Sequence, residues 1–222
     1  MTNPEELFDL YDERGRPLGL TKARHLVHRD GDWHRCFHCW IVSPNPDAPS
    51  ILLQRRSPTK DLWPGYWDVS VGGHYSAGEG IEGGLREISE EVGLDVRADE
   101  LIAVARRREV THVPTGILDR EIQDIYFLRR DVTIEDLQLN PEEVTGLALV
   151  PLTTFQALAT NRIASVTAPG IEVRTGKTVR CEAVSVEGNA LVPRAGGYYA
   201  RVARLGRQLA LGTAMPHRWR RW

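Results

Sequence analysis

The segment between residues 81 and 92 constrains the fold more than any other part of the chain. Its apolar residues are spaced four, three and four apart, which places them along one stripe of an α-helix; they are Ile81, Leu85, Ile88 and Val92. Gly93 follows directly, where glycine commonly ends a helix in the left-handed conformation. The sequence therefore predicts an amphipathic helix over 81–92 that buries one stripe against another layer of the protein.

The other side of this helix carries carboxylates. At about 100° per residue, Glu87, Glu90 and Glu91 share one arc of the helix surface. Three like charges so close together destabilise a helix unless a cation offsets them, and Mg²⁺ prefers carboxylate oxygens. Arg86 lies four residues before Glu90 and can hold it through a guanidinium–carboxylate contact. In isolation, a solvated charged face with one ion pair would be the better explanation of this pattern.

Glycines around the carboxylates weaken that simpler explanation. Gly72 and Gly73 precede the helix, where they permit a tight turn and a close approach of backbone to a ligand. Gly83 and Gly84 lie inside the helix, where each costs roughly 0.5–1 kcal/mol relative to alanine. Such a cost is easier to understand if the helix packs close to a sheet or loop.

Strands precede and follow this helix. Residues 7–20 predict a β-hairpin, and a polar, histidine-bearing connection leads from it to a strand within 34–42. Further strands are predicted at 51–54, 68–71, 101–110, 121–128 and 147–150. Residues 153–159 open a helix, 161–195 predict an irregular strand-bearing segment, and 198–211 predict an amphipathic helix. The order indicates a mixed sheet with helices packed on it.

Length and composition narrow the classes of function. The 222 residues, 41% of them hydrophobic, suit one large domain or a domain with a tail. A formal net charge of −2 gives no global field for nucleic acid or a membrane surface. Neither a signal peptide nor a run of about 18 apolar residues is present. We expect a cytoplasmic protein with no membrane or nucleic-acid partner. The sequence leaves open whether the protein forms a homodimer.

The cysteines do not form a disulfide framework. Three of them, Cys36, Cys39 and Cys181, are an odd and small number that suits a reducing compartment. Cys36 and Cys39 form a C-x-x-C pattern beside His34 and His38, so a zinc site is an alternative. We favour structural thiols, because the stretch is better interpreted as an extended strand and no second ligand pair stands at zinc-knuckle spacing.

The stretch from Arg86 to Leu94, R-E-I-S-E-E-V-G-L, resembles the second half of the Nudix box, G-x5-E-x7-R-E-U-x-E-E-x-G-U with U aliphatic, at every defined position. Gly73 and Glu79 match its first half at the correct mutual spacing. Six residues rather than seven separate Glu79 from Arg86. Either the loop is one residue short, or Gly72 is the motif glycine and Gly78 replaces its glutamate.

This resemblance implies a fold, a cofactor and a set of site residues. The fold is a Nudix-type α/β/α sandwich with a mixed sheet, an N-terminal hairpin and a C-terminal helical extension. The Nudix domain would span 1–160, with its box at about 73–94, and 161–222 would pack on the same domain. Mg²⁺ or Mn²⁺ would be the cofactor. The implied catalytic residues are Glu87, Glu90 and Arg86; the implied metal ligands are Glu87, Glu90, Glu91, Glu121, Gly73 and His74.

The similarity extends over roughly residues 7–128 to the isopentenyl diphosphate isomerase branch of the superfamily. The matching residues are Tyr11–Gly19, His28, His34, Gln54–Arg56, Lys60, Trp63–Gly65, Trp67 and Gly73–His74. In those isomerases, histidines matching His28, His34 and His74 join acids matching Asp119 and Glu121 in a metal site, and basic residues matching Arg55 and Lys60 contact the diphosphate. We expect Arg55, Arg56, Lys60 and His34 to bind substrate. Loop histidines and solvated edge cations are the alternatives.

One departure separates this chain from the isomerases. They use a cysteine for proton transfer just before the Gly-His of the box, where this chain has Gly72, which cannot transfer a proton. Cys36 and Cys39 fall on a different strand and do not replace it. The leading hypothesis is therefore metal-dependent hydrolysis of a diphosphate linkage in a small molecule, such as a nucleoside diphosphate derivative. The alternatives are isopentenyl diphosphate isomerisation and a non-catalytic phosphate-ligand sensor, which would not need Arg86 and all three glutamates.

Overall fold

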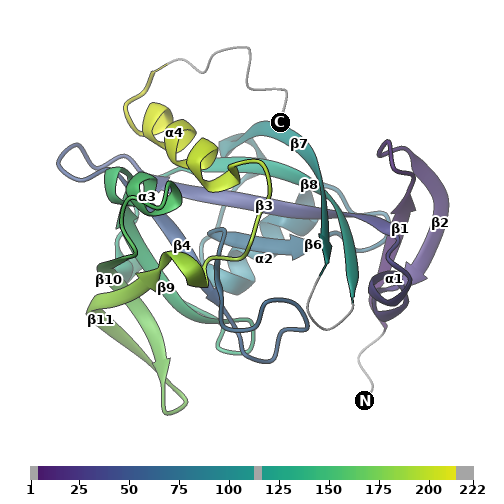
Figure 1. The fold of residues 1–222 in the computed structure, drawn as a ribbon, viewed down its shortest axis with the longest axis horizontal. Coiled ribbons are helices and arrows are strands. Elements are labelled where there is room, and N and C mark those ends of the chain that lie inside the picture. The colour runs from purple at the N-terminus through teal and green to yellow at the C-terminus, as the bar shows by residue number, and fades with distance from the viewer. Residues whose placement is uncertain (1–4, 113–116, 214–222) are drawn as a thin grey trace.

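A mixed sheet with helices on both faces forms the centre of the molecule (Figure 1). The computed structural model describes residues 5–112 and 117–213. The strands are β1 (Leu7–Tyr11), β2 (Pro17–Ala23), β3 (Trp33–Ser43), β4 (Ser50–Arg56), β5 (Trp67–Asp68), β6 (Val71–His74), β7 (Leu101–His112), β8 (Leu118–Arg129), β9 (Val144–Pro151), β10 (Ser165–Arg174) and β11 (Lys177–Glu187). The helices are α1 (Arg24–Asp30), α2 (Ile81–Val92), α3 (Leu152–Ala159) and α4 (Tyr198–Ala210), with 3-10 turns at Ala98–Glu100, Ile134–Asp136 and Gly188–Ala190.

Strand β3 orders the sheet. It pairs in parallel with β8 and antiparallel with β1, β4 and β6, and the sheet continues from β4 through β9 and β10 to β11. Almost every residue of β3 is buried, because layers cover both of its faces. Its position therefore fixes which residues of β6 and β8 lie side by side.

Two apolar cores lie on opposite faces of β3, because successive side chains of a strand point in opposite directions. Phe37 and Ile41 pack with Ile88 of α2 on one face. Trp40 and Val42 pack with residues of α3 and α4 on the other. The α/β/α sandwich with a mixed sheet that the sequence predicts is confirmed.

Most of the helices and strands predicted from the sequence are present in the structure. The hairpin predicted at 7–20 is present as β1 and β2, and the helix predicted over 81–92 matches α2. Gly93 has a φ of 75° and its N–H donates to the Ser89 carbonyl, as a helix-ending glycine should. The polar connection after the hairpin contains α1, a helix that the sequence did not predict. The segment expected to be irregular and strand-bearing forms the hairpin β10–β11, whose pairing shifts register between Ala168 and Gly170.

The C-terminal part of the described chain joins the same sheet and core. Strand β10 pairs with β9, and α4 buries Tyr198, Val202 and Leu205 in the cluster that contains Trp40. Residues 214–222 of the extension expected from the sequence lie outside the described residues.

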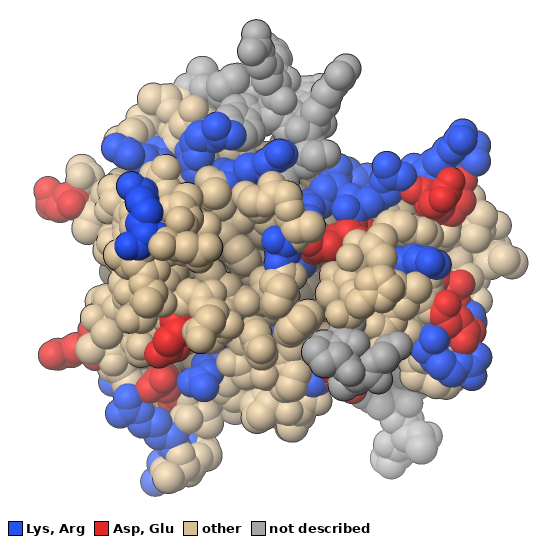
Figure 2. All heavy atoms as spheres, viewed as in Figure 1, with Lys and Arg blue, Asp and Glu red and all other residues tan. Residues whose placement is uncertain are grey.

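The surface carries charges of both signs. Figure 2 shows arginine side chains along α4, and acidic and basic groups side by side over the N-terminal hairpin. Within residues 5–112 and 117–213, no helix is long and apolar enough to cross a bilayer.

Close packing explains the glycines inside α2 and gives a prediction. A Cβ on Gly84 would lie 2.5 Å from the Phe37 ring, whereas a Cβ on Gly83 would meet chiefly the carboxylate end of the longer Glu79 side chain. We expect Gly84→Ala to lower the free energy of unfolding by about 1–3 kcal/mol through overpacking, and Gly83→Ala to lower it less. Urea unfolding of both variants measures the difference, and an equal or smaller loss for Gly84→Ala would contradict the packing argument.

Candidate active site

A cavity of about 350 Å³ lies between α2, the strands β3, β6 and β8, and the turn after β4. Most of the side chains that line it are ionisable. They include Cys36, His38, Arg56, Lys60, Asp68, His74, Arg86, Glu87, Glu90, Asp119, Glu121, Glu143 and Arg194. A cavity with this lining suits a charged, hydrophilic ligand.

Two carboxylates of α2, Glu87 and Glu90, line one side of this cavity, and a third, Glu91, does not line it. Glu90 is 53% exposed, whereas Glu91 is buried and accepts a hydrogen bond from the Gly72 N–H at 3.1 Å. Burial raises the pKa of Glu87 to about 7 and that of Glu91 to about 8, and each carboxylate adds to the unfavourable charge near the next. These groups would be stabilised by a cation.

Arg86 holds the acidic residues of the motif together. Its guanidinium lies 3.1 Å from Glu87 Oε1, 3.2 Å from Glu90 Oε2 and 3.3 Å from Glu79 Oε2. Gly78, in contrast, has a φ of 80° and donates its N–H to Asp9. Of the two alignments that the sequence leaves open, the contacts favour the one in which Glu79 is the motif glutamate and the loop is one residue short.

Gly73 allows α2 and β6 to approach each other. A Cβ on this residue would lie 2.6 Å from the Glu87 Cγ, closer than real side chains come. The glycine therefore brings the β6 backbone directly against the helix glutamate, as expected of a residue that shares a metal site with it.

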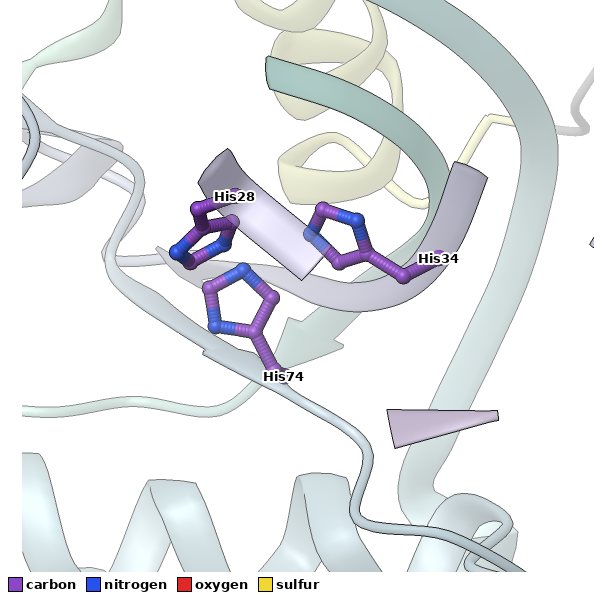
Figure 3. A group of neighbouring side chains, drawn as sticks. All are labelled: His28, His34 and His74. Atoms are coloured by element: carbon purple, nitrogen blue, oxygen red, sulfur yellow. The ribbon is translucent and has the colours of Figure 1, made fainter. Parts of the chain in front are cut away.

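Three histidines from separate elements converge beside the cavity (Figure 3): His28 of α1, His34 of β3 and His74 of β6. Their ring centroids lie 5.0 to 5.4 Å apart. Burial lowers the pKa of His28 to about 4 and that of His74 to about 3, so both imidazoles are neutral at physiological pH. Neutral imidazoles are the form that binds metals.

Buried polar atoms in this cluster lack hydrogen-bond partners. Within the described part of the chain, none is found for the Nε2 atoms of the three histidines or for Asp119 Oδ1. His34 Nε2 is 3.7 Å from Asp119 Oδ1, and His74 Nε2 is 3.7 Å from Glu121 Oε1, beyond hydrogen-bond length. An unsatisfied buried polar atom costs about 1–3 kcal/mol, so this group fits a bound cation.

The basic residues expected to bind substrate divide into two groups. Arg56 and Lys60 line the cavity, near Asp68 and Glu143 respectively. Arg55 does not line it: its side chain is 45% exposed and contacts Gly65 O and Glu172. Successive residues of β4 point to opposite sides, so one strand cannot present both arginines to the cavity.

His34 also lies elsewhere than expected. Its side chain is fully buried in the histidine cluster, where its Nδ1 lies 3.0 Å from the Asp32 carbonyl. This places it among the candidate metal ligands rather than on a surface that substrate could touch.

Several residues that line the cavity were not among the predicted site residues, and Cys36, His38 and Arg194 are the most informative of them. Cys36 and His38 of β3 point into it, and Arg194 enters from the segment before α4. Arg194 donates to both carboxylate oxygens of Asp68, at 2.8 and 2.9 Å, and to Glu109 at 3.0 Å. Alternation along β3 could have placed Cys36 and His38 on one face; nothing in the sequence links Arg194 to residues about a hundred positions earlier.

Comparisons with known proteins assign the chain to a protein family. A model of the NUDIX domain matches residues 32–168. An uncharacterised Nudix hydrolase of Clostridium acetobutylicum is 36% identical over 201 residues, which are 90% of this chain and 96% of that relative. The chain belongs to the Nudix family. Its enzyme class is that of the Nudix pyrophosphohydrolases.

Other relatives confirm the wider resemblance. An isopentenyl-diphosphate delta-isomerase of Paenarthrobacter aurescens is 33% identical over 149 residues, 67% of this chain and 77% of the isomerase. The crystal structure of DR0079 from Deinococcus radiodurans matches with a TM-score of 0.50 and 26% identity, covering 70% of this chain and 90% of that one. This Nudix protein is thus similar both to hydrolases and to isomerases.

The buried carboxylate of α2 predicts a pH-dependent stability. Since the pKa of Glu91 is raised from 4.5 to about 8, the folded protein keeps a proton in this window that the unfolded chain has released, and stability falls as pH rises through it. In chelator-treated protein, Glu91→Gln should therefore gain stability relative to the unchanged protein, by at least ~1 kcal/mol more at about pH 9 than at about pH 5. Denaturant unfolding at both pH values measures this.

Ser89→Ala, on the exposed side of the same helix, is the control and should shift stability equally at both pH values. A gain for Glu91→Gln that does not grow with pH would refute the assignment of a buried, reluctantly ionised carboxylate.

Proposed function

We propose that this Nudix protein hydrolyses the diphosphate linkage of a small hydrophilic molecule, such as a nucleoside diphosphate derivative, with Mg²⁺ or Mn²⁺. The observation that carries the proposal is the meeting, in one cavity, of two α2 carboxylates, Glu87 and Glu90, with the cations Arg56 and Lys60. Carboxylates can hold a divalent ion, and the two cations can contact phosphate oxygens.

The residues of α2 fit a hard divalent cation. Glu87, Glu90 and Glu91 would hold it together with the Gly73 carbonyl. Burial, and to a smaller extent a neighbouring carboxylate, raises the pKa values of Glu87 and Glu91, and a bound cation would oppose both effects. When bound, such a cation offsets negative charge on the diphosphate and makes a coordinated water more acidic. Arg86 keeps Glu87 and Glu90 in place through its contacts with both.

Glu87 and Glu90 are the candidates for the general base that activates water. Both line the cavity, and both contact Arg86, at 3.1 and 3.2 Å. The one that is not itself bound to the cation would act as the base, because a bound cation holds a carboxylate ionised and makes it a weak proton acceptor.

The histidine cluster supports a second cation. We propose that His28, His34 and His74 hold it with Asp119 and Glu121, on the evidence of the unpartnered Nε2 and Oδ1 atoms. This site matches the one that the isomerase resemblance implies, and it adjoins the cavity through His74 and Glu121.

Hydrolysis is favoured over isomerisation by the position of the thiols. Allylic isomerisation needs a proton donor on one side of a carbon skeleton and an acceptor on the other. Each group lies one van der Waals contact of 3.5–4 Å from the skeleton, so the two groups are separated by about two such contacts. Cys36 opens into the cavity, but its Sγ lies within 4.8 Å of a Glu121 oxygen. No carbon chain fits between them, so Cys36 does not take over the role left vacant at Gly72.

The proposal is tested by incubating the full chain with nucleoside diphosphate derivatives, dinucleotides, coenzyme A and isoprenoid diphosphates, with Mg²⁺ or Mn²⁺. We expect release of phosphate or a nucleotide from at least one of them. Glu87→Gln and Glu90→Gln should each lower turnover of that substrate by about 100-fold or more.

Glu82→Gln is the matched control, because Glu82 is exposed on the same helix and does not line the cavity; it should keep full turnover. Binding of a substrate without any cleavage would support the sensor instead, and movement of the double bond in isopentenyl diphosphate would support the isomerase.

A further inference from the structure

Cys36 and His38, which the proposed hydrolase does not use, form a group of metal-ligating side chains with Glu121. The two β3 residues are two positions apart and so share a face of the strand, and Glu121 lies on the neighbouring strand β8. One sulfur, one imidazole nitrogen and one carboxylate oxygen lie within 4.8 Å of one another. Cys36 is 2% and His38 4% exposed.

The His38 ring is held in place through its Nδ1 atom, the nitrogen that would not bind the ion. Its Nδ1 lies 3.0 Å from the Tyr198 hydroxyl, which also accepts a hydrogen bond from the Trp40 Nε1–H at 3.0 Å. Histidines that bind metals are commonly fixed in this way through their second nitrogen. With Nδ1 engaged, Nε2 is the nitrogen left for a ligand.

The donor set selects the class of ion. Thiolate, imidazole and carboxylate together suit Zn²⁺ and similar borderline cations, whereas Mg²⁺ takes oxygen donors. The carboxylates of α2 offer oxygen only, so the two sites differ in chemistry. Arg194 Nη1 lies 4.0 Å from Glu121 Oε2, but Asp68 and Glu109 already balance its charge.

We propose that Cys36, His38 and Glu121 form a binding site for a zinc-class cation at the inner wall of the cavity. Binding releases the Cys36 thiol proton to solvent and forms one metal–sulfur bond. Glu121 also belongs to the group with His34 and Asp119, so its carboxylate would be shared with the histidine cluster. The inference concerns binding alone and does not depend on which diphosphate is cleaved.

The other cysteines supply controls. Cys39 is three residues further along β3 and therefore points to the opposite face, where it packs in the apolar cluster with Phe37 and Ile88. Cys181 lies on β11. The C-x-x-C pair thus does not share one ion; the thiol nearer the N-terminus joins His38 and Glu121 instead.

The test uses Co²⁺ in place of Zn²⁺ on the chelator-stripped full chain. A thiolate bound to Co²⁺ gives a near-ultraviolet charge-transfer band that oxygen and nitrogen ligands do not give. We expect the band to appear on titration, to be abolished by Zn²⁺ and to persist in excess Mg²⁺. Cys36→Ser should remove it, whereas Cys39→Ser and Cys181→Ser should keep it.

One further measurement does not depend on replacing the thiol. Tyr198→Phe should weaken Co²⁺ binding at this site by about 10- to 100-fold while the band remains at saturation. Absence of the band in the unchanged protein, its survival in Cys36→Ser, or its loss in Cys39→Ser would overturn the proposal.

Discussion

The pairing of β3 with β6 and β8 is the constraint on which the rest of the site depends. Its register sets Cys36 beside His74 on one side and His34 beside Glu121 on the other. A slip by one residue would turn every β3 side chain to the opposite face. His34, Cys36 and His38 would then point into the apolar core under α2. Burial of Phe37 and Ile41 against that helix therefore fixes the chemistry on the other face.

The second constraint is the close contact of α2 with the sheet. Gly84 lets the helix approach Phe37, and Gly73 lets the β6 backbone approach Glu87. The resulting burial raises the pKa values of Glu87 and Glu91, so the protein holds carboxylates where they ionise reluctantly. A bound divalent cation would offset the free-energy cost of ionising these buried carboxylates. Metal binding is therefore linked to the stability of the same helix.

Sequence reasoning succeeded where the signal is periodic and local. The stripe of α2 and its terminal Gly93 are visible in twelve or so consecutive residues, because a helix repeats every 3.6 residues. The predicted grouping of His28, His34 and His74 came from resemblance, and the convergence of their rings agrees with it. The strand-bearing segment expected at 161–195 is present as β10 and β11, which pair with each other with one register shift between Ala168 and Gly170. The sequence did not predict that β10 also joins the sheet through β9, because no local pattern marks that pairing.

The sequence by itself determined that a helix would present Arg86 and three glutamates, that its opposite stripe would be buried, and that Gly72 stands where the isomerases need a proton-transfer group. Only the tertiary structure decided which other groups meet that helix. Because side chains alternate along β4, Arg55 points away from the cavity. The register of β3 directs Cys36 and His38 into the cavity, and Arg194 reaches it from the segment between the last strand and α4. Which face of β3 and β4 meets the cavity depends on strand pairing between residues distant in the chain, and Arg194 is held there by ion pairs with Asp68 and Glu109. Local spacing can group side chains on one face of a strand, but it does not encode these distant contacts.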